Sequence, residues 1–301
     1  MIRRSQVGFT LVEMIMVIVI TGIIGGMVAM FLKAPIQQYM DVARRADMTD
    51  IADTALRRIT RDLRLALPNS VRVVPGTCPV TAVNPGGTGT CSFLEFLPTS
   101  GGGRYRADTG GGAGCTASPS GEALDFAVAD ACFGVLGGMP PGFVFTAGDL
   151  VAIYNLGIPG ANAYSADNTA AINVGGSTTS IIKLNAVKLF MLASPNARFD
   201  IINKPVSYVC DPNVGHTLTR YWGYNIQAGQ PTTAAQLSLG GAASSALLAN
   251  FVSTCSFSYD LFVVAQRSGL VTMNLAITKL DAAGSSETVA LYSAVHVSNQ
   301  P

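Results

Sequence analysis

The chain has 301 residues, enough for one large domain or two modest ones, with a formal net charge of +1 and only 12% charged residues. Its 19 basic residues are scattered among 18 acidic ones, so no field that would attract nucleic acid is expected, and nucleic-acid binding is excluded as a leading function. Hydrophobic residues gather at the N-terminal end, and the 32 glycines mark many turns. This distribution is typical of a membrane anchor followed by a turn-rich β domain.

The N-terminal segment has the features of a retained membrane anchor. It begins with the basic stretch MIRRSQVG, and residues 14–32 then carry no charge, close to the ~20 residues that cross a bilayer as a helix. Arg3 and Arg4 precede the apolar run, so the positive-inside rule predicts a cytoplasmic N-terminus and an exported remainder. No small-residue cleavage site follows the run, so we expect it to be retained.

Glu13 lies at the edge of the apolar segment, where an ionised carboxylate is costly without a positive partner. The residues alone leave two interpretations open. Glu13 either stays hydrated at the depth of the membrane interface, or it pairs with a positive group that another chain supplies.

Residues 8–13 read GFTLVE ahead of an apolar helix, and this string resembles the cleavage and methylation motif of type IV prepilins and type II secretion pseudopilins. The resemblance implies that a membrane peptidase cuts between Gly8 and Phe9, that Phe9 is N-methylated, and that Glu13 pairs with a neighbouring subunit's N-terminal amine. A charge satisfied only by the next subunit would set subunit register. Met30 stands where major pilins commonly carry a kinking Pro, which favours a minor pilin or a pseudopilin.

After the membrane segment, residues 36–67 carry apolar residues at the spacing of an amphipathic helix, and Pro68 ends the pattern. If residues 9–67 are helical with a bend near Pro35, the helix is about 90 Å long. Four arginines with interleaved aspartates lie near its end, and we expect a solvated face or a surface that pairs with neighbouring subunits. They are Arg57, Arg58, Arg61 and Arg64.

Beyond Pro68, short β-prone runs separated by Gly, Pro, Asn and Ser predict an antiparallel β domain. Residues 271–278 and 288–297 alternate as a hairpin would, whereas residues 234–252 favour helix or loop, and the glycine runs at 101–103 and 110–112 favour flexible loops. Other strands are expected at residues 93–97, 124–127, 150–154, 187–191, 206–210, 217–221 and 256–262.

The expected organisation is therefore an α+β chain in four parts. We predict a leader peptide at residues 1–8, a transmembrane helix at 9–33, an amphipathic periplasmic helix at 34–68, and a β-rich globular domain with disulfides at 69–301.

Six cysteines, all beyond the hydrophobic segment, indicate an oxidising compartment and disulfides. Zinc is the rival use, but no C-x-x-C pair exists and the two histidines lack ligand spacing, so no metal site is expected. The sequence does not fix the connectivity. The lower entropic cost of short loops favours Cys78 with Cys91, Cys115 with Cys132, and Cys210 with Cys255.

Ser180 and Lys183 match the S-x-x-K spacing of serine acyl enzymes, but the segment predicts a strand and the companion motifs are absent, so we expect no enzyme activity and no cofactor. Loop carboxylates such as Asp167 and Asp211 could ligate calcium, although turn formation explains them more simply. Trp222 and its tyrosine neighbours Tyr221 and Tyr224 could stack on a sugar, as in a tip adhesin, although such aromatics are more often divided between core and surface.

Four strings in the outer domain resemble minor pilins of mannose-sensitive haemagglutinin pili, at residues 204–211, 218–224, 255–259 and 295–301. The resemblance implies an assembly protein in the bacterial inner membrane, with its outer domain in the periplasm. The implied partners are other minor and major pilins, the prepilin peptidase and the inner-membrane assembly platform. A type II secretion pseudopilin and a tip adhesin remain alternatives, and residues 76–185 match no pattern that assigns a role.

Overall fold

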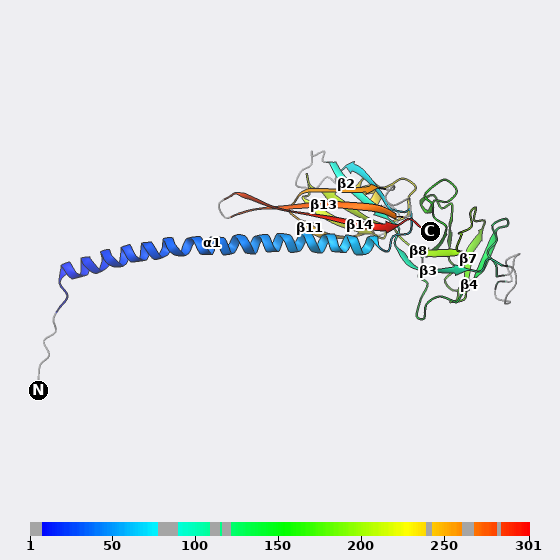
Figure 1. The fold of residues 1–301 in the computed structure, drawn as a ribbon, viewed down its shortest axis with the longest axis horizontal. Helices are drawn as coiled ribbons and strands as arrows, with labels where there is room; N and C mark the ends of the chain where they lie inside the picture. Colours follow the sequence, from blue (N-terminus) through cyan, green and yellow to red (C-terminus); the bar gives the residue numbers. More distant parts are fainter. Residues whose placement is uncertain are drawn as a thin grey trace, which may run out of the picture.

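A computed structural model describes residues 8–77, 90–108, 115, 122–238, 243–260, 268–281 and 284–301. One long helix, α1 (Leu11–Leu63), runs from the N-terminal end into a β lobe, and a second β lobe lies beyond it, at the end of the molecule farthest from the N-terminus (Figure 1). All strand pairs in the named sheets are antiparallel. The predicted α+β class is confirmed.

The helix α1 has 53 residues and is therefore about 80 Å long. Pro35 lies inside it without ending it, and the bend expected near Pro35 is seen in Figure 1 only as a gentle curve of the helix. The helix ends at Leu63, about one turn before the predicted end. Leu67 instead donates its backbone N–H to the carbonyl of Leu97 at 2.8 Å, so strand-like pairing ends the helix before Pro68 can.

The first lobe, which we call the proximal lobe, is a sandwich of two sheets. The five-stranded sheet has the order β1-β2-β9-β10-β11, and the three-stranded sheet has the order β12-β13-β14. The strands of the first are β1 (Arg72–Thr77), β2 (Thr90–Phe96), β9 (Val206–Asp211), β10 (Thr217–Trp222) and β11 (Ser244–Asn250). Those of the second are β12 (Val252–Asp260), β13 (Ser268–Leu280) and β14 (Ser286–Ser298).

The C-terminal half of α1 closes this sandwich. Met48, Ala52 and Ile59 are fully buried on the same face of the helix, and they share one hydrophobic cluster with residues of both sheets, among them Tyr208 and Met273. Each large side chain buried there contributes roughly 1.5–3 kcal/mol. Because α1 carries part of the core, the exposed first half of the helix and the lobe form one continuous structure.

The second lobe, which we call the distal lobe, is inserted between β2 and β9. Its sheet has the order β6-β5-β8-β3-β4-β7, and a bridge between Ile172 and Leu184 brings the two edges together, so the sheet nearly closes on itself. Its strands are β3 (Thr99–Tyr105), β4 (Asp130–Leu136), β5 (Leu150–Ile153), β6 (Thr169–Ala171), β7 (Ile181–Lys188) and β8 (Arg198–Ile202).

The hairpin predicted near the C-terminus is confirmed as β13 and β14, and the strands expected at 93–97, 150–154, 206–210 and 217–221 correspond to β2, β5, β9 and β10. The strand expected at 256–262 corresponds to β12, although residues 261 and 262 lie outside the described part of the chain.

Three segment predictions are wrong. Residues 124–127 are irregular, with bends at 126 and 127, and residues 189–191 follow the end of β7. Residues 234–252 contain the strand β11 besides the short helix α2 (Ala234–Leu237). The serine- and alanine-rich β11 pairs with β10 along its length, so a neighbouring strand overrides its weak intrinsic β propensity.

The glycine run 101–103 was expected to be a flexible loop, but it lies within β3. A Cβ atom at Gly102 would sit 2.8 Å from the carbonyl oxygen of Phe199, and one at Gly103 would sit 2.9 Å from its ring. The glycines therefore allow β8 to approach β3 closely, a recognised reason for glycine inside a strand. The second run, at 110–112, lies outside the described residues.

Two disulfides are seen among the described residues. Cys115 pairs with Cys132 in the distal lobe, and Cys210 of β9 pairs with Cys255 of β12 across the proximal sandwich, with Cα–Cα distances of 5.8 and 6.0 Å. These are two of the pairs that short loop closure favours. Cys78 lies outside the described residues, so its pairing with Cys91 stays a prediction.

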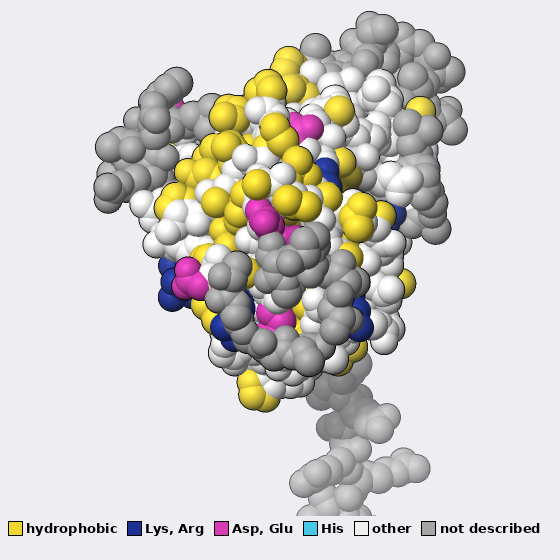
Figure 2. Space-filling view, turned by 90° about the vertical axis from the view of Figure 1, so that its right-hand side faces the viewer, with side chains coloured by type: hydrophobic (Ala, Val, Ile, Leu, Met, Phe, Trp, Pro, Cys, Tyr) yellow, Lys and Arg dark blue, Asp and Glu magenta, His cyan; other side chains and the backbone are white. Residues whose placement is uncertain are grey.

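The far end of the distal lobe exposes hydrophobic side chains. Figure 2 views the molecule from this end and shows hydrophobic residues spread over much of the surface. The exposed hydrophobic residues of the lobe include Val128, Val144, Val187 and Met191, of which Val144 is 74% exposed.

Asp200 of β8 gives the distal lobe a pH-dependent stability. Burial raises the pKa of its carboxyl group from 3.8 to about 6, and nearby Arg198 only partly opposes this effect. The fold therefore favours the protonated form of Asp200. The contribution of this group to the free energy of unfolding is fully present below about pH 4 and is lost as the pH rises through about 6.

We expect Asp200→Asn to stabilise the protein at pH 7 by up to about 3 kcal/mol, because a shift of about two pKa units corresponds to that free energy. At pH 4 the variant and the parent should unfold at the same temperature. Thermal unfolding of the detergent-solubilised full chain at both pH values measures this, with Asp108→Asn at an exposed position as control. An equal effect of Asp200→Asn at both pH values would rule out the titration.

Candidate assembly site at the N-terminal helix

The N-terminus of α1 is fixed by a capping box between Thr10 and Glu13. The Thr10 hydroxyl accepts a hydrogen bond from the Glu13 backbone N–H at 3.3 Å, and the Glu13 carboxylate accepts one from the Thr10 backbone N–H at 3.1 Å. This arrangement satisfies backbone donors at the helix end, and the negative charge is also favoured there by the helix dipole. Glu13 thus lies one turn from Phe9, which is 83% exposed just ahead of the cap.

Sequence reasoning singled out Glu13 but missed the role of Thr10. The signal was present, because Thr10 followed by Glu13 directly before an apolar run is the pattern of a capping box.

The first half of α1 presents an unpartnered apolar surface. The most hydrophobic 18-residue window of the helix has a mean hydropathy of 2.6, and none of it is buried within the chain. Its side chains include Leu11, Ile15, Val19 and Phe31, all about half exposed or more. A surface of this length and composition fits membrane anchoring.

Comparison with known families adds one direct match. Residues 3–29 match the prokaryotic N-terminal methylation motif. The chain is therefore pilin-like: it carries the signal of type IV pilins and pseudopilins, which implies processing by a prepilin peptidase and assembly with other pilins. No curated protein and no solved structure matches the chain.

Near the C-terminal end of α1, Asp62 anchors the helix to the five-stranded sheet. Its carboxylate accepts hydrogen bonds from the Tyr208 hydroxyl at 2.7 Å and from the Arg220 side chain at 2.9 Å, and it forms an ion pair with Arg58 at 3.2 Å. Burial raises the pKa of Tyr208, and the Asp62 carboxylate raises it further. One of the four clustered arginines, Arg58, thus serves the helix–lobe contact.

Nearer the membrane end of the lobe, the β13–β14 hairpin lies along α1 (Figure 1). Glu287 of β14 forms ion pairs with Arg44 and Arg45, and Lys279 of β13 forms one with Asp47. These contacts tie the hairpin to the helix over about one turn. The proximal lobe therefore holds α1 at both ends of their contact.

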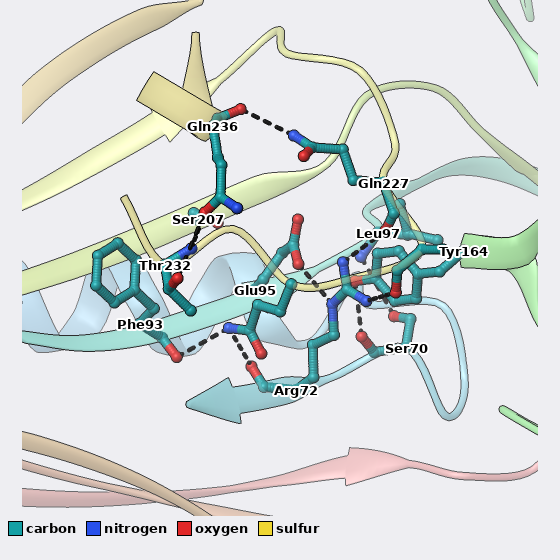
Figure 3. A network of polar contacts seen from close by, with 12 residues as sticks. Ser70, Arg72, Phe93, Glu95, Leu97, Tyr164, Ser207, Gln227, Thr232 and Gln236 are labelled. Atoms are coloured by element: carbon teal, nitrogen blue, oxygen red, sulfur yellow. Dashed lines mark hydrogen bonds and ion pairs between the residues drawn. The ribbon is translucent and has the colours of Figure 1, made fainter. Parts of the chain in front are cut away.

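A buried polar network joins the two lobes and is a second candidate site (Figure 3). The Arg72 side chain forms an ion pair with the fully buried Glu95 at 2.6 Å, and its guanidinium carbon lies 3.5 Å from the ring centroid of Tyr164 in the distal lobe. The Tyr164 hydroxyl donates to the carbonyl of Ser70 at 2.9 Å, and Tyr224 donates to Glu95 at 2.8 Å.

Burial raises the pKa of Glu95, while Arg72 and the Tyr224 hydroxyl oppose that shift. The two terminal nitrogens of Arg72 donate hydrogen bonds to the carbonyls of Gln227 and Ala228, at 2.8 and 2.7 Å. Since the charged groups of this network satisfy one another, it fits a structural tie between the lobes.

The other patterns raised by the sequence have structural explanations in the fold. Asp211 accepts hydrogen bonds from the backbone N–H groups of Val214 and Gly215, as a turn former does. The prediction that Tyr221, Trp222 and Tyr224 could stack on a sugar together is wrong, because Tyr224 is fully buried in the network above. Ser180 lies just before β7 and Lys183 lies within it, not one helical turn apart.

Among the described residues no group of three or more His, Cys, Asp or Glu side chains could hold a metal ion.

Proposed function

We propose that this chain is a minor pilin of a type IV pilus of the mannose-sensitive haemagglutinin type, similar in role to the biogenesis protein MshO. The methylation motif at residues 3–29, continuous with an exposed apolar helix, carries the assignment to pilin-like proteins. The four outer-domain strings support the finer role, and they fall on β9, β10, β12 and β14 of the proximal lobe. Met30, in place of a kinking Pro, separates the chain from bulk filament subunits.

In this proposal a prepilin peptidase cuts between Gly8 and Phe9, Phe9 is N-methylated, and α1 remains in the bacterial inner membrane. The N-terminus faces the cytoplasm and both lobes lie in the periplasm, where the disulfides form. The assembly platform then packs α1 among other minor and major pilins. The protein acts as a structural subunit, without catalysis or a cofactor.

The intact mass of the chain from native membranes tests the proposal. In cells with prepilin peptidase we expect the loss of residues 1–8 and the gain of one methyl group, and in cells without the peptidase we expect the uncut chain. A chain that stays uncut in both would contradict the pilin assignment.

A type II secretion pseudopilin is the alternative role, with the same processing but different cargo. Deletion of the gene separates the two roles, because loss of surface pili with normal protein secretion supports the pilus role. The reverse result would favour the pseudopilin.

A further inference from the structure

A cleft of about 430 Å³, which we call the interlobe cleft, lies where the two lobes meet. Its proximal wall consists of residues 69–72 and Tyr259 of β12. Its distal wall is the loop between β5 and β6, with Leu156, Ile158 and Asn162. The volume is within the range of small-molecule sites, which occur preferentially at such junctions. All its lining residues lie beyond α1, so the cleft is separate from the helix and its apolar surface.

The ring of Tyr259 is held in the wall of the cleft by two neighbours. A Cβ atom at Gly269 would lie 2.3 Å from the Cε2 atom of Tyr259, so a larger residue on β13 would displace the ring. Asn299 has one amide orientation that satisfies both of its ends. Its Oδ1 atom then accepts from the Gly269 N–H and its Nδ2 atom donates to the Tyr259 hydroxyl, each at 3.1 Å. The hydroxyl proton of Tyr259 therefore stays available for a ligand.

Two asparagine side chains in the cleft also keep hydrogen-bonding capacity. The Asn162 Oδ1 atom accepts from the Tyr164 N–H at 3.0 Å, and the Asn69 Nδ2 atom donates to two backbone carbonyls at 2.8 and 3.2 Å. Within the described part of the chain, the Asn162 Nδ2 group and the Asn69 Oδ1 atom form no hydrogen bond. The cleft thus offers donors from Tyr259 and Asn162 and an acceptor from Asn69.

The described residues that line the cleft carry no unpaired charge. Arg72 is the charged one among them, and it is committed to Glu95 and to two backbone carbonyls (Figure 3). A charged ligand would therefore lose its hydration there without gaining a free counter-charge. The aliphatic part of the wall consists of Val71, Leu156 and Ile158, and Ile158 is 50% exposed. These properties suit a neutral ligand that has both hydroxyl groups and an apolar face.

We propose that the interlobe cleft binds a neutral sugar residue of a glycan. The sugar hydroxyls accept hydrogen bonds from Tyr259 and Asn162 and donate to Asn69, while the C–H face of the sugar ring packs on the Tyr259 ring and on Ile158. The bound sugar contacts both lobes at once. This binding activity goes beyond the structural role proposed above and does not depend on it.

A peptide is the rival occupant, because its backbone also carries neutral donors and acceptors. Peptides are commonly bound by addition to an open strand edge or by insertion of a helix into an apolar groove. Loops form most of the wall of the interlobe cleft, at residues 69–71 and 156–162. The convergent groups there are side-chain amides and a phenol, which favours a sugar over an extended backbone.

Saturation-transfer NMR on the full chain, solubilised in a detergent without a sugar headgroup, tests the inference. The probes are cellotriose, mannotriose, triacetylchitotriose and the peptide tetraalanine, each titrated to millimolar concentration. We expect transfer to the ring protons of at least one sugar. Tyr259→Ala should raise the Kd for that sugar about tenfold, the combined scale of an aromatic contact and a hydrogen bond.

Two further variants separate binding from folding. Ile158→Ala changes a half-exposed side chain, so the unfolding temperature should stay the same while the Kd rises about threefold through lost apolar contact. Tyr292→Ala is the matched control, because it removes an exposed tyrosine of β14 outside the cleft and should leave the Kd unchanged. Absence of transfer to every sugar, binding of tetraalanine alone, or equal loss in Tyr292→Ala would each overturn the inference.

Discussion

Glu13→Ala is expected to reduce surface pili at least tenfold while leaving cleavage after Gly8 largely intact. The carboxylate lies beyond the cut, so the peptidase reaction does not depend on its charge. Under the proposed function, by contrast, the carboxylate pairs with a neighbouring subunit's N-terminal amine in the membrane or filament core. Sheared pili, quantified by immunoblot beside the mass of the processed chain, measure the two effects separately.

The capping box supplies matched controls. Glu13→Gln keeps the hydrogen bond to Thr10 but removes the charge, whereas Thr10→Ala weakens the cap and keeps the charge. We expect Glu13→Gln to behave like Glu13→Ala, and Thr10→Ala to assemble within about twofold of the parent, since loss of a cap costs only about 1 kcal/mol. Normal piliation in Glu13→Gln would show that the cap matters and the charge does not.

The joint substitution Cys210→Ala with Cys255→Ala is expected to lower the free energy of unfolding by about 4 kcal/mol. The bond closes a loop with a sequence separation of 45 residues, and the chain-entropy relation gives this magnitude. Because it links β9 to β12, its loss removes the covalent tie between the two sheets of the proximal lobe. Thermal unfolding of the solubilised full chain under oxidising conditions measures the change.

Removal of Cys115 and Cys132 is the matched control, with a shorter separation of 17 residues and an expected loss of about 3 kcal/mol. Hydrogen exchange should locate the two effects in different lobes, with β9 and β12 losing protection in the first variant and β4 in the second. Unchanged unfolding in the Cys210 and Cys255 variant would show that this bond carries no stability.

Prediction from sequence succeeded best where local signals were strong. The apolar run of α1, the alternation in β13 and β14, and the Val- and Tyr-rich β9 each have one dominant pattern, and each folds as expected. Prediction failed at β11 and at the glycines of β3, because pairing with β10 and the close approach of β8 are contacts between distant parts of the chain.

The division of the β domain into two lobes was likewise not predicted from the sequence. The distal lobe is an insertion between β2 and β9, and its return point is marked by no change in composition. The ion pair of Arg72 with Glu95, and its contact with Tyr164, join residues up to 92 positions apart, so only the folded chain brings them together.

The sequence by itself determined the part of this protein that acts through local chemistry: the residue 8–13 motif, the apolar length of α1 and the charge at Glu13. Those features depend on neighbouring residues along one helix, so their spacing is sufficient. The tertiary structure alone decided what covers the apolar face of α1, which is the pair of sheets in the proximal lobe. That choice depends on where two separate sheets meet the helix, and such long-range packing leaves no local signal in the sequence.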